Sequence, residues 1–225
     1  MNINVLLNSG TSGAQGGSAS ASKTATVGAA PPLLAKAGQR IQSALDATSA
    51  QLSKFGLLKS ALADGQVTAL ALTQLSSSAR PEAVTTALGT FFKTFNAAIS
   101  AATGAANSAA STSASSSARR VISDSKSALR SDPAVVDAMK KLGLTSQSDG
   151  SLVQDAKKFA TSLANDPAGV RAALAAVGKK VEVLNSRELA TSGTVGAALT
   201  GLNQQNTALT TQQKALKAFE QTASS

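Results

Sequence analysis

A serine and a lysine at the spacing Ser-x-x-Lys are the residues of this sequence that come nearest to a catalytic pair. Ser123 and Lys126 match the pattern in which a lysine amine activates a serine hydroxyl. The match lies in a serine-rich stretch, where chance matches are frequent, and no companion motif accompanies it. The chain has no His and no Cys, which removes the commonest general base and every thiolate nucleophile. We therefore expect that the protein is not an enzyme.

Two other short stretches resemble ligand-binding loops but lack the residues that such loops need. Asp149-Gly150 is similar to part of a calcium loop, yet only Asp155 could add a nearby carboxylate, and the alternating acidic ligands are missing. Gly178-Lys179 is followed by Lys180 rather than Ser or Thr, and the earlier glycine of a phosphate-binding loop is absent. The sequence predicts neither a metal site nor a cofactor.

The charge balance favours anionic partners, but the distribution of charge along the chain does not. The formal net charge is +9, from 21 Lys and Arg residues against 12 Asp and Glu residues. The basic residues cluster only in pairs such as Arg119-Arg120, and no aromatic residues are interleaved to stack on bases. We interpret the charge as a solvated helical surface and expect no nucleic acid partner. The alternative, a basic nucleic-acid-binding protein, predicts binding that weakens steeply with salt.

The composition favours long helices over a bulky globular core. Hydrophobic residues make up 43% of the chain but aromatic residues only 3%, so much of the apolar fraction is Ala. Ala buries little area, but it is the best helix former and lets helix backbones approach closely. No stretch approaches 18 consecutive apolar residues, so we expect no transmembrane segment. The expected fold is all-α, an elongated helical bundle or coiled coil formed by the N- and C-terminal helices.

Shifts in composition divide the chain into five expected parts. Gly, Ser and Thr dominate the first part, which cannot bury enough apolar surface to offset its ordering entropy. The parts are a disordered N-terminal arm (1–30), a helical hairpin (31–103), a Ser/Ala-rich linker (104–118), a small helical unit (119–190) and a C-terminal helix that pairs with the first (191–225).

Proline, glycine and acidic residues set the expected helix boundaries. The hairpin should contain helices over 33–75 and 82–103, with a break in the first near Asp64-Gly65. The apolar residues of the second helix, from Val84 to Ile99, could form a docking face but are better explained as the core of a bundle.

The helices of the expected 119–190 unit have their own start and stop signals. Asp132-Pro133 and Asp166-Pro167 each place an acidic N-cap before a proline at the first helical position. Gly143 can take the left-handed conformation that ends a helix. A further helix is expected to start at Asp149 or Ser151, and the helix from Pro167 is expected to end near residue 178.

Two segments show the spacing of a coiled coil. Steps of three, four and seven residues connect apolar positions near both ends of the chain, and polar residues at such positions fix register and oligomeric state. The expected helix-pairing residues are Ile41, Leu45, Leu52, Phe55 and Leu62 in the first segment, and Leu199, Leu202, Asn206, Leu209, Gln213 and Leu216 in the last. The C-terminal helix could pair specifically with the first helix, or it could be an amphipathic tail that packs loosely with its amides in water.

Four stretches together resemble the flagellar filament cap protein (hook-associated protein 2) family. Their order and the spacing from Asp149-Gly150 to Asp166-Pro167 carry the likeness. They are Leu52–Leu75, similar to the family's N-terminal coiled-coil helix; Phe91–Ile99, with Phe95-Asn96 at the family's aromatic-Asn motif; Leu142–Val170; and Thr207–Thr222, similar to the family's C-terminal helix. The chain departs from the family in lacking the large β-rich domains before the aromatic-Asn motif.

The resemblance implies a structural, non-enzymatic flagellar axial or cap-like protein. It implies association through the terminal helices, with itself as a homo-oligomer or with hook and filament proteins. It also implies export as an unfolded chain, with an export chaperone as a further partner, and a location in the secreted flagellum. The alternatives are a secreted or cytoplasmic helical binding module, effector-like or chaperone-like, with the cytoplasm as the alternative location.

Overall fold

The computed structural model describes residues 32–107 and 112–223, and these residues form helices and one small hairpin. The expected disordered arm lies outside the described residues. The elements in chain order are α2 (Pro32–Thr73), α3 (Pro81–Ala106), α4 (Thr112–Arg130), α5 (Pro133–Lys141), β1 (Leu144–Ser146), β2 (Leu152–Gln154), α6 (Ala156–Asn165), α7 (Pro167–Leu189) and α8 (Thr194–Ala223). The fold is all-α, as the sequence predicts.

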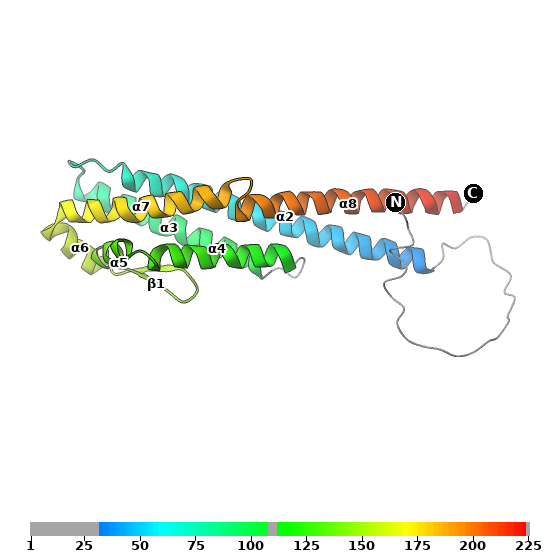
Figure 1. Cartoon of the computed structure of the whole chain (residues 1–225), viewed down its shortest axis with the longest axis horizontal. Coiled ribbons are helices and arrows are strands. Elements are labelled where there is room, and N and C mark those ends of the chain that lie inside the picture. The colour runs from blue at the N-terminus through cyan, green and yellow to red at the C-terminus, as the bar shows by residue number, and fades with distance from the viewer. Residues whose placement is uncertain (1–31, 108–111, 224–225) are drawn as a thin grey trace.

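The long helix α2 organises the molecule because three other helices pack along it. α3 and α7 contact its C-terminal half, whereas α8 continues beyond α7 and runs back along the N-terminal half (Figure 1). We call residues 32–50 and 203–223 the stalk, and residues 51–107 and 112–202 the body. Figure 1 shows the stalk as a pair of helices that projects from the body. The molecule is therefore elongated.

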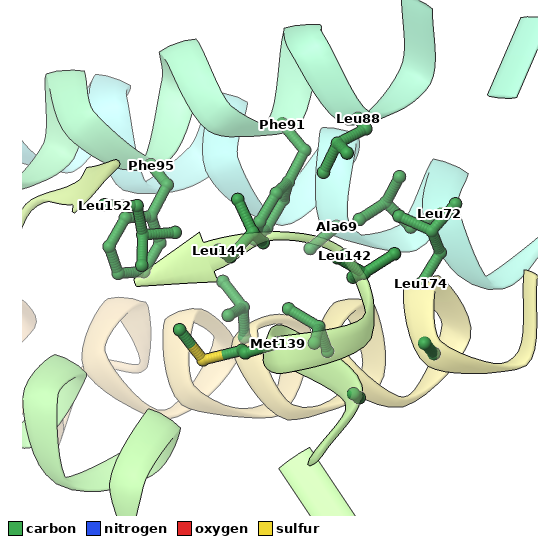
Figure 2. Packing of buried hydrophobic residues seen from close by; sticks show 14 of the residues in the cluster. Ala69, Leu72, Leu88, Phe91, Phe95, Met139, Leu142, Leu144, Leu152 and Leu174 are labelled. Atoms are coloured by element: carbon green, nitrogen blue, oxygen red, sulfur yellow. The ribbon is translucent and has the colours of Figure 1, made fainter. Parts of the chain in front are cut away.

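The main hydrophobic core lies inside the body. Phe91 and Phe95 of α3 pack there with rings 6.0 Å apart, between α2, α7 and the hairpin (Figure 2). Val84, Leu88 and Ile99 are also buried, so the apolar stripe of α3 is core and not a docking face. A second cluster, half of whose buried members are Ala, lies in the part of the body nearer the stalk.

The expected acidic caps and the expected glycine stop are confirmed. The Asp132 carboxylate accepts a hydrogen bond from the backbone N–H of Ala134, and that of Asp166 accepts one from Gly169. Pro133 and Pro167 occupy the first position of their helices, where a missing N–H has no cost. Gly143 adopts a φ of 67° just after α5. These signals are local, so they act as the sequence predicts.

The helix expected from Asp149 or Ser151 starts later, because a β-hairpin precedes it. The Asp149 carboxylate bonds the backbone N–H and the hydroxyl of Ser151, and Gly150 has a φ of 95°, which together form a tight turn. β1 and β2 pair on either side of this turn. Helix α6 then starts at Ala156, capped by Asp155.

The linker expected over residues 104–118 is wrong for the residues that the structure describes there. α3 extends to Ala106, and α4 starts at Thr112. Ala105, Ala106 and Ala118 are buried, because small side chains allow these helices to pack closely. The 119–190 segment is not a separate unit either, since Leu129 and Met139 share one core with Ala69 and Phe91. Low complexity here reflects close helix packing.

Two glycines expected to end or break helices are instead points of close helix contact. α2 runs unbroken through Gly65, where an added Cβ would lie 2.9 Å from the Asn185 amide nitrogen. α7 continues past residue 178 to Leu189, and a Cβ at Gly178 would lie 2.5 Å from the carbonyl oxygen of Ala69. Both glycines bring α2 and α7 together. The prediction of a break and of an early end was wrong because tertiary packing, not propensity, fixes these positions.

Candidate helix-pairing interface

The N-terminal half of α2 and helix α8 lie antiparallel, and two contacts give their register. The Gln213 side-chain amide donates a hydrogen bond of 2.7 Å to the side-chain oxygen of Gln42. One turn further, a Cβ added at Gly38 would lie 3.5 Å from a methyl group of Leu216. Continuing this register towards the body places Leu45 beside Leu209 and Thr48 beside Asn206. The amide at Gln213 is therefore paired within the chain.

The residues expected on the two seams differ in how deeply they are buried. Fully buried members lie mostly in the body: they are Ile41, Phe55, Leu62 and Leu202. The half-buried members lie along the stalk and where it joins the body: they are Leu45, Leu52, Leu199, Asn206, Leu209, Gln213 and Leu216. Ile41 is the buried exception on the stalk, whereas its other seam residues, including Leu45, Leu209 and Leu216, keep part of their surface in solvent. The stalk thus carries an apolar surface that the described chain does not cover.

A buried glutamine, which was not among the expected seam residues, lies beside the expected position Leu52. Gln51 is completely buried, and its amide donates to the carbonyl oxygen of Ala105 at 3.3 Å. Its own side-chain oxygen has no hydrogen-bond partner among the described residues. The steps 48, 51, 55, 58 and 62 form an unbroken heptad pattern, and this spacing could have identified Gln51 if its polarity had been ignored. The end of α3 packs here and decides which residue is buried.

The aromatic-Asn motif performs a structural task in the body. Phe95 is buried in the core, whereas the half-buried Asn96 reaches strand β2. The Asn96 side chain donates to the carbonyl oxygen of Leu152 at 3.0 Å and accepts from its N–H at 2.7 Å. The side-chain amide therefore forms the pair of hydrogen bonds that the backbone of a neighbouring strand would form, and it connects α3 to the hairpin.

A cluster of charges, also missed by the sequence analysis, marks the end of α7 beside the stalk. Glu188 is 1% exposed, and its carboxylate contacts Arg187 at 2.9 Å. Arg187 also contacts Asp124 of α4 at 3.2 Å. The second oxygen of Glu188 has no hydrogen-bond partner among the described residues. This cluster fixes α4 against the end of α7, just before the chain turns into α8.

Two exposed carboxylates of the body have lowered pKa values. The Ser151 hydroxyl is the main cause that lowers the pKa of Asp149, with the Ser151 backbone N–H second. The Lys141 ammonium group, 2.7 Å away, is the main cause that lowers the pKa of Asp166, with the Gly169 N–H second. The Asp149 carboxylate stabilises a turn and the Asp166 carboxylate caps a helix, so the ionised form of each stabilises the folded chain.

The lysine of the Ser-x-x-Lys pattern has a structural partner in the residues described. Lys126 of the Ser-x-x-Lys pattern donates to the carbonyl oxygen of Ser148, which holds the hairpin turn. Across residues 32–107 and 112–223, no three acidic side chains come together as a metal site would require. Within the same residues, no helix combines the length and the apolar character needed to span a bilayer.

Comparison with known proteins agrees with the resemblance seen in the sequence. No curated protein and no solved structure matches the chain. The model of the family described as flagellar hook-associated protein 2 C-terminus matches residues 66–224. This match covers the aromatic-Asn motif, the Leu142–Val170 stretch and helix α8, but it leaves out the N-terminal part of α2. The chain belongs to the flagellar hook-associated protein 2 family, whose members are structural proteins of the flagellum.

Proposed function

We propose that this protein associates through its stalk with further copies of itself or with hook and filament subunits, as a non-enzymatic axial component. The observation that carries the proposal is the half-buried seam of leucines on a pair of projecting helices. Two helices alone leave part of most seam residues in water, whereas a third or fourth helix would cover them. Full burial of a leucine is worth about 1.5–3 kcal/mol, so several half-buried leucines provide a sizeable driving force.

Polar residues in the seam support specific association rather than loose hydrophobic contact. Asn206 and Gln213 alternate with Leu209 and Leu216 along α8. A polar residue at a seam position costs stability but favours one register over its alternatives. The Gln42–Gln213 hydrogen bond supports such a register within the chain.

The proposal concerns axial association and not the formation of a terminal plate. Residues 74–80 connect α2 directly to α3, where cap proteins of the family resemble one another in carrying large β-rich domains. The body therefore presents only helices and a short hairpin at that end. We propose that the stalk carries the interaction with other subunits.

The test is a charge placed in the stalk seam. We expect Leu209→Asp to abolish self-association, or co-sedimentation with hook and filament subunits, while the helical content and the thermal midpoint of the body stay near wild type. Gln205→Asp is the matched control, because it puts the same charge on an exposed position of α8 one turn away. Sedimentation velocity over a range of concentrations measures the effect. Unchanged association of Leu209→Asp would contradict the proposal.

We further propose that the chain leaves the cell through the flagellar export channel, with a chaperone holding it beforehand. The stalk supports this because its half-buried leucines would need cover before assembly. A tagged chain should accumulate outside wild-type cells but stay inside cells with a defective flagellar export channel. Retention in both strains would overturn this part of the proposal and favour a cytoplasmic helical module.

A further inference from the structure

An apolar groove lies at the end of the body farthest from the stalk. Helices α3 and α6 and strand β2 form it, and its volume is about 490 Å³. Its lining includes Gly89 of α3, Gln154 of β2 and Leu163 of α6. A Cβ added at Gly89 would meet nothing within 4 Å, so the groove is open at this point.

One wall of the groove is an incomplete strand edge. The backbone bonds from Gln147 to Ser151 and from Asp155 to Gly143 show which residue pairs are hydrogen-bonded across the hairpin. Because such pairs alternate in antiparallel strands, the N–H and C=O groups of Leu152 and Gln154 point away from β1. The Asn96 side chain satisfies both groups of Leu152. Among the described residues, no group forms a hydrogen bond with the backbone N–H or C=O of Gln154, a residue that lines the groove.

An extended apolar peptide fits both features of this site. A strand laid beside β2 would pair its backbone with Gln154 and place alternate side chains in the groove. Residues 3–7 of this chain read Ile-Asn-Val-Leu-Leu, so that Ile3, Val5 and Leu7 fall on one face of an extended strand. The remainder of residues 1–30 is mostly Gly, Ser, Thr and Ala, so this segment is its main group of large apolar side chains.

The distances favour a segment from a second copy. α2 has 42 residues and therefore spans about 63 Å between Pro32 and the end of the body that holds the groove (Figure 1). Residues 8–31 connect the segment to Pro32, and a random coil of 24 residues with a Gly- and Ser-rich composition has a root-mean-square end-to-end distance of about 27 Å. The same chain could reach its own groove only if these 24 residues, which span at most about 80 Å, were drawn out over about 63 Å, which costs chain entropy. A second copy whose stalk end lies near the groove could reach it without stretching.

We propose that residues 3–7 of one copy bind as an added strand in the β2–α3–α6 groove of another copy. The contact joins the N-terminal segment of one molecule to the far end of the next, which is a head-to-tail arrangement. Such a contact can repeat from one copy to the next, which suits an axial assembly. It is separate from the stalk pairing proposed above and does not require it.

The lack of cysteine in the chain allows a direct test by disulfide formation. Val5→Cys protein is mixed with Gly89→Cys protein of different tag length under mild oxidation. We expect a mixed dimer to form at least ten times faster than with Gly104→Cys, the matched control. Gly104 is an exposed glycine of the same helix with nothing within 4 Å of an added Cβ. Equal rates for the two glycine positions would overturn the proposal. A Val5→Cys/Gly89→Cys double variant that forms its disulfide only within one chain would overturn it as well.

A second measurement uses a labelled peptide of residues 1–10 and the full-length protein. Gly89→Leu should fill the groove and weaken peptide binding at least tenfold in fluorescence anisotropy, whereas Gly104→Leu should leave it unchanged. Both substitutions raise helix propensity, so loss of folding is not expected. The stalk variant Leu209→Asp should bind the peptide normally, which separates this proposal from the stalk proposal. Equal binding by wild type and Gly89→Leu would contradict the groove assignment.

Discussion

In the body, α2 is surrounded by α3, α7 and the start of α8, whereas along the stalk the helix that runs beside it in the described residues is α8. The heptad spacing of α2 continues through both regions. In the body it yields fully buried residues such as Phe55, Leu58 and Leu62, while in the stalk Ile41 is buried but Leu45 stays half-buried. The heptad spacing therefore decides which face of a helix is apolar, and the number of neighbouring helices decides how deeply that face is buried. The body is complete by itself, and the stalk has surface left for a partner.

The largest expected difference between the two regions comes from truncation of a core side chain in each. Phe91 is completely buried in the body, so Phe91→Ala should cost about 3–5 kcal/mol of unfolding free energy. Leu209 is half-buried in the stalk, so Leu209→Ala should cost about 1 kcal/mol. Denaturant unfolding followed by circular dichroism measures both values. Similar losses for the two variants would break the distinction between body and stalk.

A smaller effect is expected from the amide that joins α3 to the hairpin. Asn96→Ala leaves the N–H and C=O groups of Leu152 without their partner, which should cost about 1–3 kcal/mol. The same readout applies, and hydrogen exchange of the Leu152 amide should speed up more than exchange in α8. Asn203→Ala is the control, because Asn203 is exposed and lies on the stalk. A loss no greater than that of the control would show that the hairpin does not depend on Asn96.

At the junction of body and stalk, we expect a substitution that stabilises. Gln51 is buried with one oxygen unpaired, so Gln51→Met keeps the volume and removes an unsatisfied polar atom. The unfolding free energy should rise by about 1 kcal/mol, since the hydrogen bond lost to Ala105 is long at 3.3 Å. A clear decrease would mean that the amide bond is worth more than the unpaired oxygen costs.

The smallest expected effect is the acid sensitivity of the body. The folded pKa values of Asp149 and Asp166 are lowered, so their contribution to stability is complete above the ordinary aspartate pKa of about 3.9. It is lost as the pH falls from there through the folded pKa values, because protonation then favours the unfolded chain. Asp166→Asn keeps a capping side chain and should flatten the fall in stability below pH 4. An unchanged pH profile would show that the ion pair with Lys141 contributes nothing measurable.

The local features of the fold could be predicted from the sequence. Asp132, Asp166 and Gly143 act through groups within a few residues of themselves, so their caps and turns follow from the chain alone. The all-α class, the apolar stripe of α3 and the family resemblance also rest on patterns that the sequence contains. The hairpin was missed because a tight turn at Asp149 and Gly150 competes with helix initiation, and Asn96, far away in sequence, stabilises the turn's second strand.

The sequence by itself determined which faces of the helices are apolar and where most helices begin. Only the tertiary structure decided that Gly65 and Gly178 are contact points, that Ala105 and Ala118 are core, and that Gln51 is buried. The physical reason is that burial and close approach depend on neighbours that lie far apart in the chain. From sequence alone, a small residue indicates a helix break or a linker. Whether another helix packs against it depends on the fold, which brings together segments that lie far apart in the chain.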